Sequence, residues 1–137
     1  MTRLIDVALG EWGEAERHGA DSNPRILEYL RSAGLSSTTD GTPWCGAFMA
    51  WCAARCGVVP PPHPAAARSW LTVGQAVSGP ALGDIVVLER GERWQGHVAF
   101  FICRRGNMIP LLGGNQGDRV GIADYDTSRV LGYRRIG

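Results

Sequence analysis

The stretch TPWCGAFMAW, residues 42–51, decides how the chain is interpreted, because it places a cysteine where a helix is about to begin. Pro43 suits the first turn of a helix, and the apolar stripe that starts at Cys45 predicts a helix over roughly residues 44–56, closed by Gly57. The helix dipole and the unpaired N–H groups of a first turn stabilise a thiolate and lower the pKa of its thiol. Cys45 is therefore a candidate nucleophile, and it needs a histidine base and an orienting group elsewhere in the chain.

The sequence before this helix predicts further helices, and the sequence after it predicts strands. Amphipathic or capped segments favour helices over residues 3–16 and over SNPRILEYLRSAG, residues 22–34. After a proline-rich connector and a short segment at residues 69–71, apolar or alternating runs favour about five strands, at residues 84–89, 97–104, 107–112, 119–123 and 130–135. Their connections are too short for helical crossovers, so neighbouring strands should be antiparallel. This order predicts one α+β domain over residues 1–137.

Composition and charge exclude several classes of protein. Hydrophobic residues make up 45% of the chain, and 14 basic against 13 acidic side chains create no field that would attract nucleic acid. The arginine pairs at 104–105 and 134–135 are therefore interpreted as a solvated rim rather than a phosphate-binding patch. No apolar run approaches the roughly 18 residues of a membrane span, so we expect no membrane insertion. Residues 1–19 lack the apolar core of a signal peptide, so we expect synthesis in the cytoplasm without one.

Four cysteines also allow a disulfide framework, or a zinc site built from Cys52, Cys56, Cys103 and His97. A disulfide framework needs an oxidising compartment, which the missing export signal does not suggest. Cys52 and Cys56 lie one helical turn apart and Cys103 follows in a strand pattern, unlike the close ligand pairs of structural zinc sites. We therefore expect reduced thiols, no metal and no cofactor, with these three cysteines packed in the core.

The candidate base is His97, which begins GHVAFFICRR, a segment that is apolar on both faces and so predicts a central strand. The next predicted strand ends in LLGGNQG, and one hairpin register would place Asn115 beside His97. An asparagine there can accept a hydrogen bond from the imidazole and fix its tautomer, while the two preceding glycines permit close approach. GGNQG is equally typical of a plain turn, and a lone histidine at a strand start can be a hydrogen-bonded edge residue.

Together these segments resemble the CHAP and NlpC-type cysteine peptidases and amidases of the papain-like superfamily, and most closely a compact group found in phage and bacterial genomes. That group carries TPWCxxFxxW, ARSW, GDIVV, GHVxF and GGNQ segments, which here read TPWCGAFMAW, ARSWL, GDIVVLERG, GHVAFF and LLGGNQGDRV. The resemblance covers nearly the whole chain and implies a papain-like fold with N-terminal helices packed on an antiparallel sheet. It also implies a peptidoglycan hydrolase with Cys45 as nucleophile, His97 as general base and Asn115 as orienting group. Many CHAP domains carry a glutamate whose corresponding place here is Gly113, so the histidine would have only a neutral partner.

The implied reaction is attack of the Cys45 thiolate on an amide carbonyl, with His97 protonating the departing amine and then activating water against the thioester. The backbone N–H of Cys45 would stabilise the oxyanion, with Gln116 or Asn115 as the candidate side-chain donor. Trp44 is expected to form a wall of the cleft, with core packing as the alternative. The scissile bond stays open between N-acetylmuramoyl-L-alanine, a stem-peptide link such as D-glutamyl to diaminopimelate, and a cross-bridge.

Two other functions stay open at this stage. One is a catalytically silent module of the same fold that binds the cell wall or forms part of a phage tail, and the other is an acyl-transfer enzyme with the same triad. The joint presence of cysteine, histidine and asparagine favours the hydrolase, because a decayed site usually loses one of them. We expect peptidoglycan as the partner, reached after phage release through a holin, as for an endolysin, or by tail or secretion machinery, with an immunity protein as a further partner.

Overall fold

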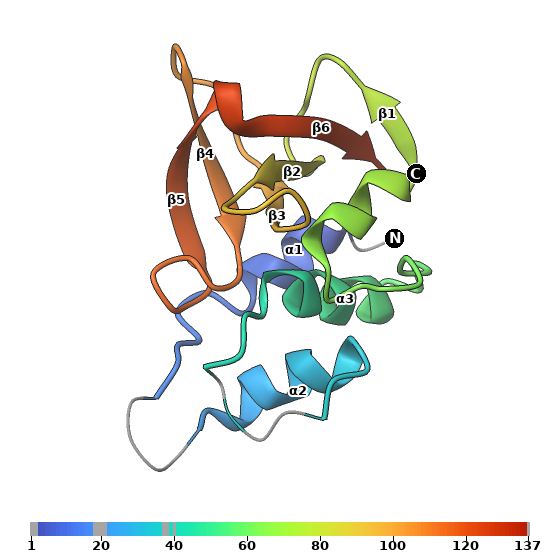
Figure 1. The fold of residues 1–137 in the computed structure, drawn as a ribbon, viewed down its shortest axis with the longest axis vertical. Helices are drawn as coiled ribbons and strands as arrows, with labels where there is room; N and C mark the ends of the chain where they lie inside the picture. The colour runs from blue at the N-terminus through green and yellow to red at the C-terminus, as the bar shows by residue number, and fades with distance from the viewer. Residues whose placement is uncertain (1–2, 18–21, 37–38, 40, 137) are drawn as a thin grey trace.

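The computed structural model describes residues 3–17, 22–36, 39 and 41–136, in which helices precede a six-stranded sheet (Figure 1). The helices are α1 (Leu4–Leu9), α2 (Pro24–Ser32) and α3 (Cys45–Arg55), with short 3-10 helices η1 (Ala67–Thr72) and η2 (Thr127–Arg129). The strands are β1 (Gln75–Val77), β2 (Ile85–Glu89), β3 (Gly96–Phe101), β4 (Met108–Gly113), β5 (Gly121–Asp126) and β6 (Val130–Arg135). The predicted α+β class with an antiparallel sheet is confirmed. Across the described ranges, no helix is both long enough and apolar enough to cross a bilayer.

The two longer helices begin close to where the sequence places them. Asn23 caps α2 by accepting a hydrogen bond from the N–H of Arg25 at 2.9 Å, and Pro24 occupies the first helical position. Helix α3 begins at Cys45 and is buried through Ala53, so it is the central helix of the domain. This burial explains why its sequence is apolar nearly all round rather than striped.

The first helix is shorter than the predicted segment of residues 3–16. It ends at Leu9, and Gly13 adopts a left-handed φ of 89° that turns the chain away from the helical path. The backbone then bonds to the loop before β5, with the N–H of Gly13 donating to the carbonyl of Val120 at 3.0 Å. Long-range backbone pairing therefore replaces the last turns of the expected helix.

The sheet has the order β1-β6-β2-β3-β4-β5, and all neighbouring strands are antiparallel, as predicted. Strands β2 to β5 form a meander, but β6 returns to pair with β2 instead of continuing beyond β5. The unpredicted strand β1 has three residues and pairs only with β6. Strand β3 ends at Phe101 rather than at residue 104, and the strand expected at residues 119–123 lies at 121–126.

The two faces of the sheet belong to two apolar clusters. On β3, Val98 and Phe100 pack in the cluster that contains the helices, whereas Ala99 and Phe101 pack in a second cluster on the opposite face. The second cluster is completed by side chains from the neighbouring strands β2 and β4: Val86, Leu88, Ile109 and Leu111. His97 has the same strand parity as Ala99, and its ring stacks on Tyr125, which packs against the second cluster.

Strands β3 and β4 diverge at the end where β3 begins. Their Cα pairs are Phe100↔Leu112 and Phe101↔Leu111, so the first residues of β3 have no partner on β4. The chain after β4 instead passes directly against α3, because a Cβ on Gly114 would lie 2.7 Å from the Cβ of Phe48. The expectation that glycine permits a close approach at this point is confirmed.

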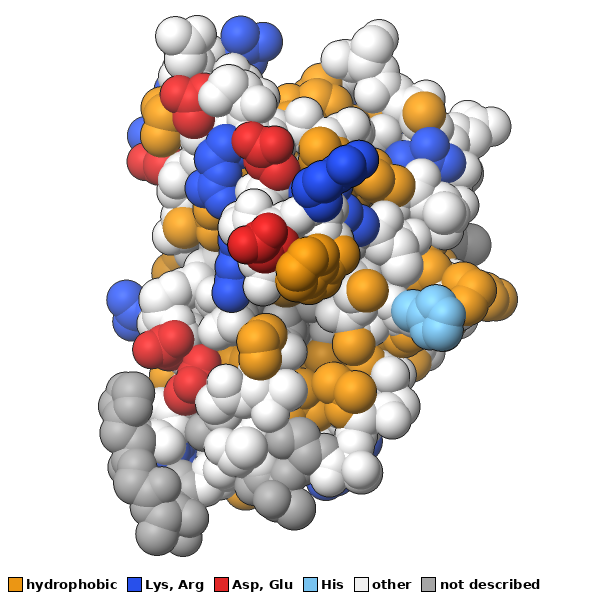
Figure 2. All heavy atoms as spheres, in the orientation of Figure 1, with side chains coloured by type: hydrophobic (Ala, Val, Ile, Leu, Met, Phe, Trp, Pro, Cys, Tyr) orange, Lys and Arg blue, Asp and Glu red, His pale blue; other side chains and the backbone are white. Residues whose placement is uncertain are grey.

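Charged side chains are mixed over the surface rather than segregated. On the face shown in Figure 2, basic and acidic side chains lie interspersed, mainly over the part of the molecule that the strands occupy in Figure 1. This distribution agrees with a formal net charge of +1. It supports the exclusion of a broad basic surface for nucleic acid on this face.

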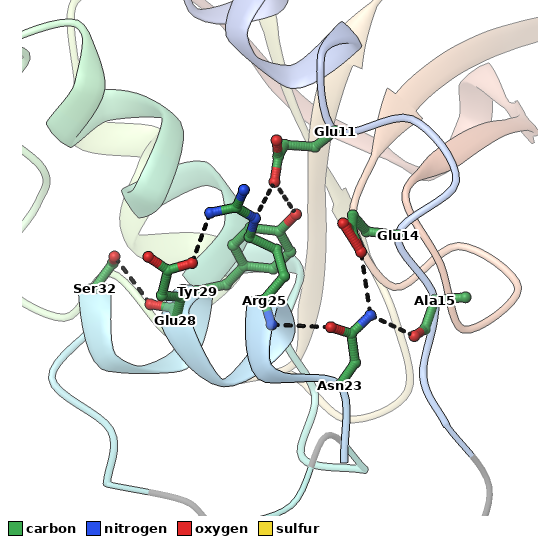
Figure 3. A network of polar contacts seen from close by, with 8 residues as sticks. All are labelled: Glu11, Glu14, Ala15, Asn23, Arg25, Glu28, Tyr29 and Ser32. Carbon is green, nitrogen blue, oxygen red and sulfur yellow. Dashed lines mark hydrogen bonds and ion pairs between the residues drawn. The ribbon is translucent and has the colours of Figure 1, made fainter. Parts of the chain in front are cut away.

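The acidic segment before α2 ties that helix to the rest of the domain (Figure 3). The hydroxyl of Tyr29 donates to Oε1 of Glu11 at 2.7 Å, and the same oxygen lies 3.0 Å from Nε of Arg25. Nδ2 of Asn23 donates to Glu14 at 3.3 Å and to the carbonyl of Ala15 at 2.8 Å. Burial is the main cause that raises the pKa of Tyr29, so its hydroxyl stays a donor. These glutamates therefore have structural partners, which the sequence did not reveal.

Candidate active site

Cys45 is the first residue of α3, and it is buried with 5% of its surface exposed. Burial raises the pKa of its thiol, and the backbone N–H groups of Val98, Gly46 and Cys45 itself only partly oppose this effect. The helix start thus stabilises the thiolate as expected, but desolvation is the larger influence. The resting thiol is therefore neutral, which corrects the expectation of a lowered pKa.

The N–H of Val98 reaches the thiol because β3 has no neighbour there. The N–H of Phe101 donates to the carbonyl of Asp84 at 2.8 Å, so the odd-numbered residues of β3 direct their backbone groups to the β2 side. Val98 therefore directs its N–H to the β4 side, beyond the last β3–β4 pair. Cys45 lies in this opening, directly against the residue that follows His97.

His97 is the second residue of β3 and is 3% exposed. Its ring stacks on that of Tyr125, with centroids 5.3 Å apart and an interplanar angle of 29°. Its Nε2 lies 2.9 Å from Oε1 of Gln116. Burial lowers the pKa of His97 to about 4, although the bond to Gln116 acts in the opposite direction. At neutral pH the ring is therefore uncharged and able to accept a proton.

The amide of Gln116 fixes the tautomer of this ring. Nε2 of Gln116 donates to the carbonyls of Leu111 at 3.0 Å and Gly121 at 2.7 Å, which sets the amide orientation. Its Oε1 is then an acceptor only, and it also receives the hydroxyl of Tyr125 at 3.2 Å. His97 must donate from Nε2, so its Nδ1 carries the free lone pair.

The structure thus places Gln116, and not Asn115, against the imidazole. Asn115 is half-buried at a left-handed φ of 58°, and within the described part of the chain its side chain makes no hydrogen bond to another residue. The chain turns at Asn115, and the side chain of the next residue, Gln116, then reaches His97 and the carbonyls of Leu111 and Gly121. The candidate role of Gln116 as an oxyanion donor is also wrong, because both of its N–H bonds are used by carbonyls.

Trp44 belongs to the core and does not form a cleft wall. Its side chain is fully buried, stacked on Tyr29 with centroids 5.7 Å apart and edge-on to Phe48 at 6.4 Å. Its Nε1 donates to Oε2 of Glu16 at 3.1 Å. The core-packing alternative is therefore the correct one, and the role of Trp44 is to fix the start of α3 and with it the position of Cys45.

The other cysteines differ in exposure. Cys52 is fully buried as expected, but Cys56 and Cys103 are half-buried, and Cys103 lies after the end of β3 rather than inside it. All four thiols are free. A search of the described residues finds no group of three or more side chains arranged to hold a metal ion. Asp84 accepts the N–H of Ala81 at 2.8 Å, so this carboxylate stabilises the turn before β2.

The model of the CHAP domain family matches residues 37–115, more than half of the chain. The chain belongs to the CHAP family. This membership confirms the resemblance to CHAP-type peptidases and amidases and the papain-like fold. CHAP domains are hydrolases of the cysteine peptidase and amidase kind that act on peptidoglycan. No curated protein was found to match the chain.

The CHAP match includes Cys45 and His97 but ends one residue before Gln116. The side chains that surround the imidazole, from Gln116 and Tyr125, therefore come from the sequence after the matched segment. Strand β5 carries Tyr125, and the alternation of Ala123 and Tyr125 with acidic residues along GIADYD is the sequence signal that could have identified it.

Proposed function

We propose that this CHAP domain hydrolyses an amide or peptide bond of bacterial peptidoglycan through a thioester on Cys45. The observation that carries the proposal is the bond between Nε2 of His97 and Oε1 of Gln116, next to the helix start that holds the thiol. It leaves Nδ1 of a neutral imidazole as the one ring atom that can take a proton. A nucleophile, a base and an orienting group are the parts that covalent amide hydrolysis requires.

The resting state of this pair decides how the reaction begins. Because burial raises the pKa of Cys45 and lowers that of His97, both groups are neutral before substrate binds. The proton of Sγ therefore passes to His97 as sulfur forms its bond to the carbonyl carbon. The imidazolium then gives this proton to the amine as the C–N bond breaks. His97 then takes a proton from water as the water oxygen bonds to the thioester carbon. The C–S bond breaks, the new carboxylic acid leaves, and the proton returns from His97 to the Cys45 sulfur.

The oxyanion would be stabilised by the start of α3. The first N–H groups of a helix have no acceptor inside it, and those of Cys45 and Gly46 lie at the nucleophile. Gln116 is excluded from this role by its bonds to two carbonyls. The proposal therefore assigns oxyanion stabilisation to backbone groups.

The test is digestion of purified peptidoglycan followed by mass spectrometry of the released fragments. Wild type should release fragments whose new termini identify the bond, whereas Cys45→Ala and His97→Ala should release none. Cys103→Ser, at a half-buried thiol away from α3, is the matched control and should keep full activity. The double variant Cys45→Ala/His97→Ala should lose little more than either single one, because the two residues act as a unit.

The same experiment separates the other two functions. A folded wild-type protein that binds peptidoglycan but releases nothing would identify a silent wall-binding or tail module. An acyl-transfer enzyme would instead give products that carry an added amine when an amine acceptor is supplied. Both outcomes would contradict hydrolysis, and the fragment masses tell them apart.

A further inference from the structure

Two arginines lie beside the imidazole and have no part in the proposed chemistry. Arg129, at the end of η2, places its guanidinium 5.4 Å from the ring centroid of Tyr125, which itself stacks on His97. Its Nη2 donates to the carbonyl of Glu89 at 3.0 Å, so the side chain is tied to the end of β2. A half-buried cation is thereby fixed one ring away from the candidate base.

The second arginine, Arg90, directly follows Glu89, the residue whose carbonyl accepts the hydrogen bond of Arg129. In the β2–β3 register Leu88 lies opposite His97, and Arg90 follows two residues later in the loop that joins these strands. Arg90 is exposed, and its charge is one cause that lowers the pKa values of Cys45, His97 and Tyr125. The β2–β3 loop faces the viewer in Figure 1, and basic and acidic side chains lie together at this position in Figure 2.

Neither charge is neutralised by the protein. Within the described ranges, no carboxylate oxygen lies within 4.0 Å of a guanidinium nitrogen of Arg90 or Arg129. Asp126, the carboxylate at the start of η2, accepts the N–H of Ser128 at 2.8 Å. Arg129, over the ring that stacks on His97, and Arg90, in the β2–β3 loop, therefore have no carboxylate partner in a protein whose formal net charge is only +1.

We propose that Arg90 and Arg129 form a carboxylate-binding subsite, so that the preferred substrate is a peptidoglycan amide flanked by a free carboxylate. The inference deepens the proposed function and rests on it. Guanidinium groups bind carboxylates through parallel, charge-assisted hydrogen bonds, which are roughly twice as strong as neutral ones. The stem-peptide link between D-glutamyl and diaminopimelyl residues offers such carboxylates, and amidation of these residues removes the charge.

The inference selects among the scissile bonds that the sequence leaves open. A carboxylate anchored at this subsite would direct a neighbouring stem-peptide carbonyl to Cys45, which favours an endopeptidase over an amidase acting at the sugar. An alternative role for the arginines is to lower the pKa of the thiol without touching substrate. The two roles differ in one respect: tuning of the thiol affects every substrate equally, whereas a subsite affects only the charged one.

The experiment uses two synthetic stem peptides that differ only in whether the glutamyl and diaminopimelyl carboxylates are free or amidated. The ratio of their kcat/KM values cancels any effect on the nucleophile. Wild type should prefer the free acid by about tenfold or more, and Arg90→Gln and Arg129→Gln should each bring the ratio towards one. Arg90→Lys should keep part of the preference, because it keeps the charge but not the planar fork.

Two controls lie at the opposite end of β3. Arg104→Gln removes a guanidinium that donates to the carbonyl of Gly106 at 2.8 Å, and so matches the loss of the Arg129 bond to Glu89. Arg105→Gln removes an exposed charge and matches Arg90→Gln. Both should leave the acid-to-amide ratio unchanged, and thermal melting of all five arginine variants checks that they are folded.

Each other outcome has a definite meaning. If Arg90→Gln lowers kcat/KM equally for both peptides, or if wild type does not distinguish them, the subsite is wrong. If wild type cleaves neither peptide, digestion of purified peptidoglycan decides the proposed function separately, and calorimetry with Cys45→Ala decides the inference without turnover. Tighter binding of the free acid that is lost in Cys45→Ala/Arg90→Gln would then support the subsite, and equal binding of both peptides would overturn it.

Discussion

Nε2 of His97 and Oε1 of Gln116 lie 2.9 Å apart in a part of the domain from which water is almost excluded. The partner of the imidazole is therefore a neutral amide, which fixes the ring but supplies no charge to stabilise an imidazolium. Burial then dominates and lowers the pKa of His97 to about 4. A carboxylate at this position would act in the opposite direction, so the choice of glutamine sets the protonation state of the base.

Gln116→Ala should lower kcat by about tenfold to a hundredfold, because the imidazole loses the bond that fixes its tautomer. The free energy of unfolding should fall by about 2 kcal/mol, since the carbonyls of Leu111 and Gly121 lose their donors. Asn115→Ala is the control and should change kcat by less than about threefold. Steady-state kinetics over a range of pH, with urea unfolding, measures both effects. A larger loss in Asn115→Ala than in Gln116→Ala would restore the asparagine as orienting group.

Stability should fall on acidification because of His97. Its pKa in the folded protein, about 4, is below the ordinary value of 6.5, so between these values the unfolded chain binds more protons than the folded one. His97 thus contributes about 3 kcal/mol to the free energy of unfolding. This contribution is fully present above pH 6.5, declines as the pH falls and is lost below about pH 4. Urea unfolding at several pH values measures it. His97→Gln should flatten the curve in this window, whereas His63→Gln, at an exposed histidine of the connector, should not.

Tyr125→Ala should raise the pKa of His97, because the stacked ring excludes water from the imidazole. Tyr125→Phe keeps the ring and removes only the hydroxyl bond to Gln116, so it should leave that pKa nearly unchanged and cost about 1 kcal/mol of stability. NMR titration of the His97 ring protons distinguishes the two variants. Equal pKa values in both would show that the ring of Tyr125 does not keep water from His97.

Gly114→Ala should be destabilising, because a Cβ at this position would lie 2.7 Å from the Cβ of Phe48 and 2.8 Å from the ring of Trp44. Overpacking of this kind typically costs about 1–3 kcal/mol, and displacement of α3 would also reduce activity. Gly79→Ala is the control, since no atom lies within 4 Å of its Cβ. Thermal melting compares them. Unchanged melting of Gly114→Ala would mean that the chain after β4 is free to move away from α3.

Alkylation of the native protein should not begin at the nucleophile. Cys45 is buried and its thiol pKa is raised, while Cys56 and Cys103 are half-buried and easier to reach. Iodoacetamide at neutral pH should therefore modify Cys103 or Cys56 before Cys45, and activity should persist until Cys45 reacts. Peptide mass spectrometry with parallel activity assays follows both events. If activity is lost at the same rate as the first thiol is modified, Cys45 is more accessible to iodoacetamide than its 5% exposure indicates.

The sequence predicts those parts of the fold and site that depend on local chemistry. Pro43, the apolar run that begins at Cys45, and Gly57 are enough to place α3, because helix starts and ends are set by a few neighbouring residues. The approach of the chain after β4 also follows from the sequence, since paired glycines leave room for it. The candidate nucleophile and base rest on the same local signals.

The sequence does not predict what depends on distant pairing. Asn115 and Gln116 are adjacent, and only the left-handed turn at Asn115, which the fold imposes, decides which of them meets His97. The resting pKa of Cys45 differs from the helix-start expectation because desolvation depends on everything packed around α3. Trp44 could be assigned to the core only once its bond to Glu16, 28 residues earlier, was known.

The position of β6 has a consequence for the time at which the domain becomes active. This strand follows all the others in the sequence, yet it lies between β1 and β2 in the sheet. The residues around the imidazole, Gln116 and Tyr125, also come from the last part of the chain, whereas Cys45 is made early. A nascent chain on the ribosome therefore carries the thiol long before it can hold the base in place. The proposed hydrolytic activity should therefore appear only after β6 has been synthesised and has entered the sheet.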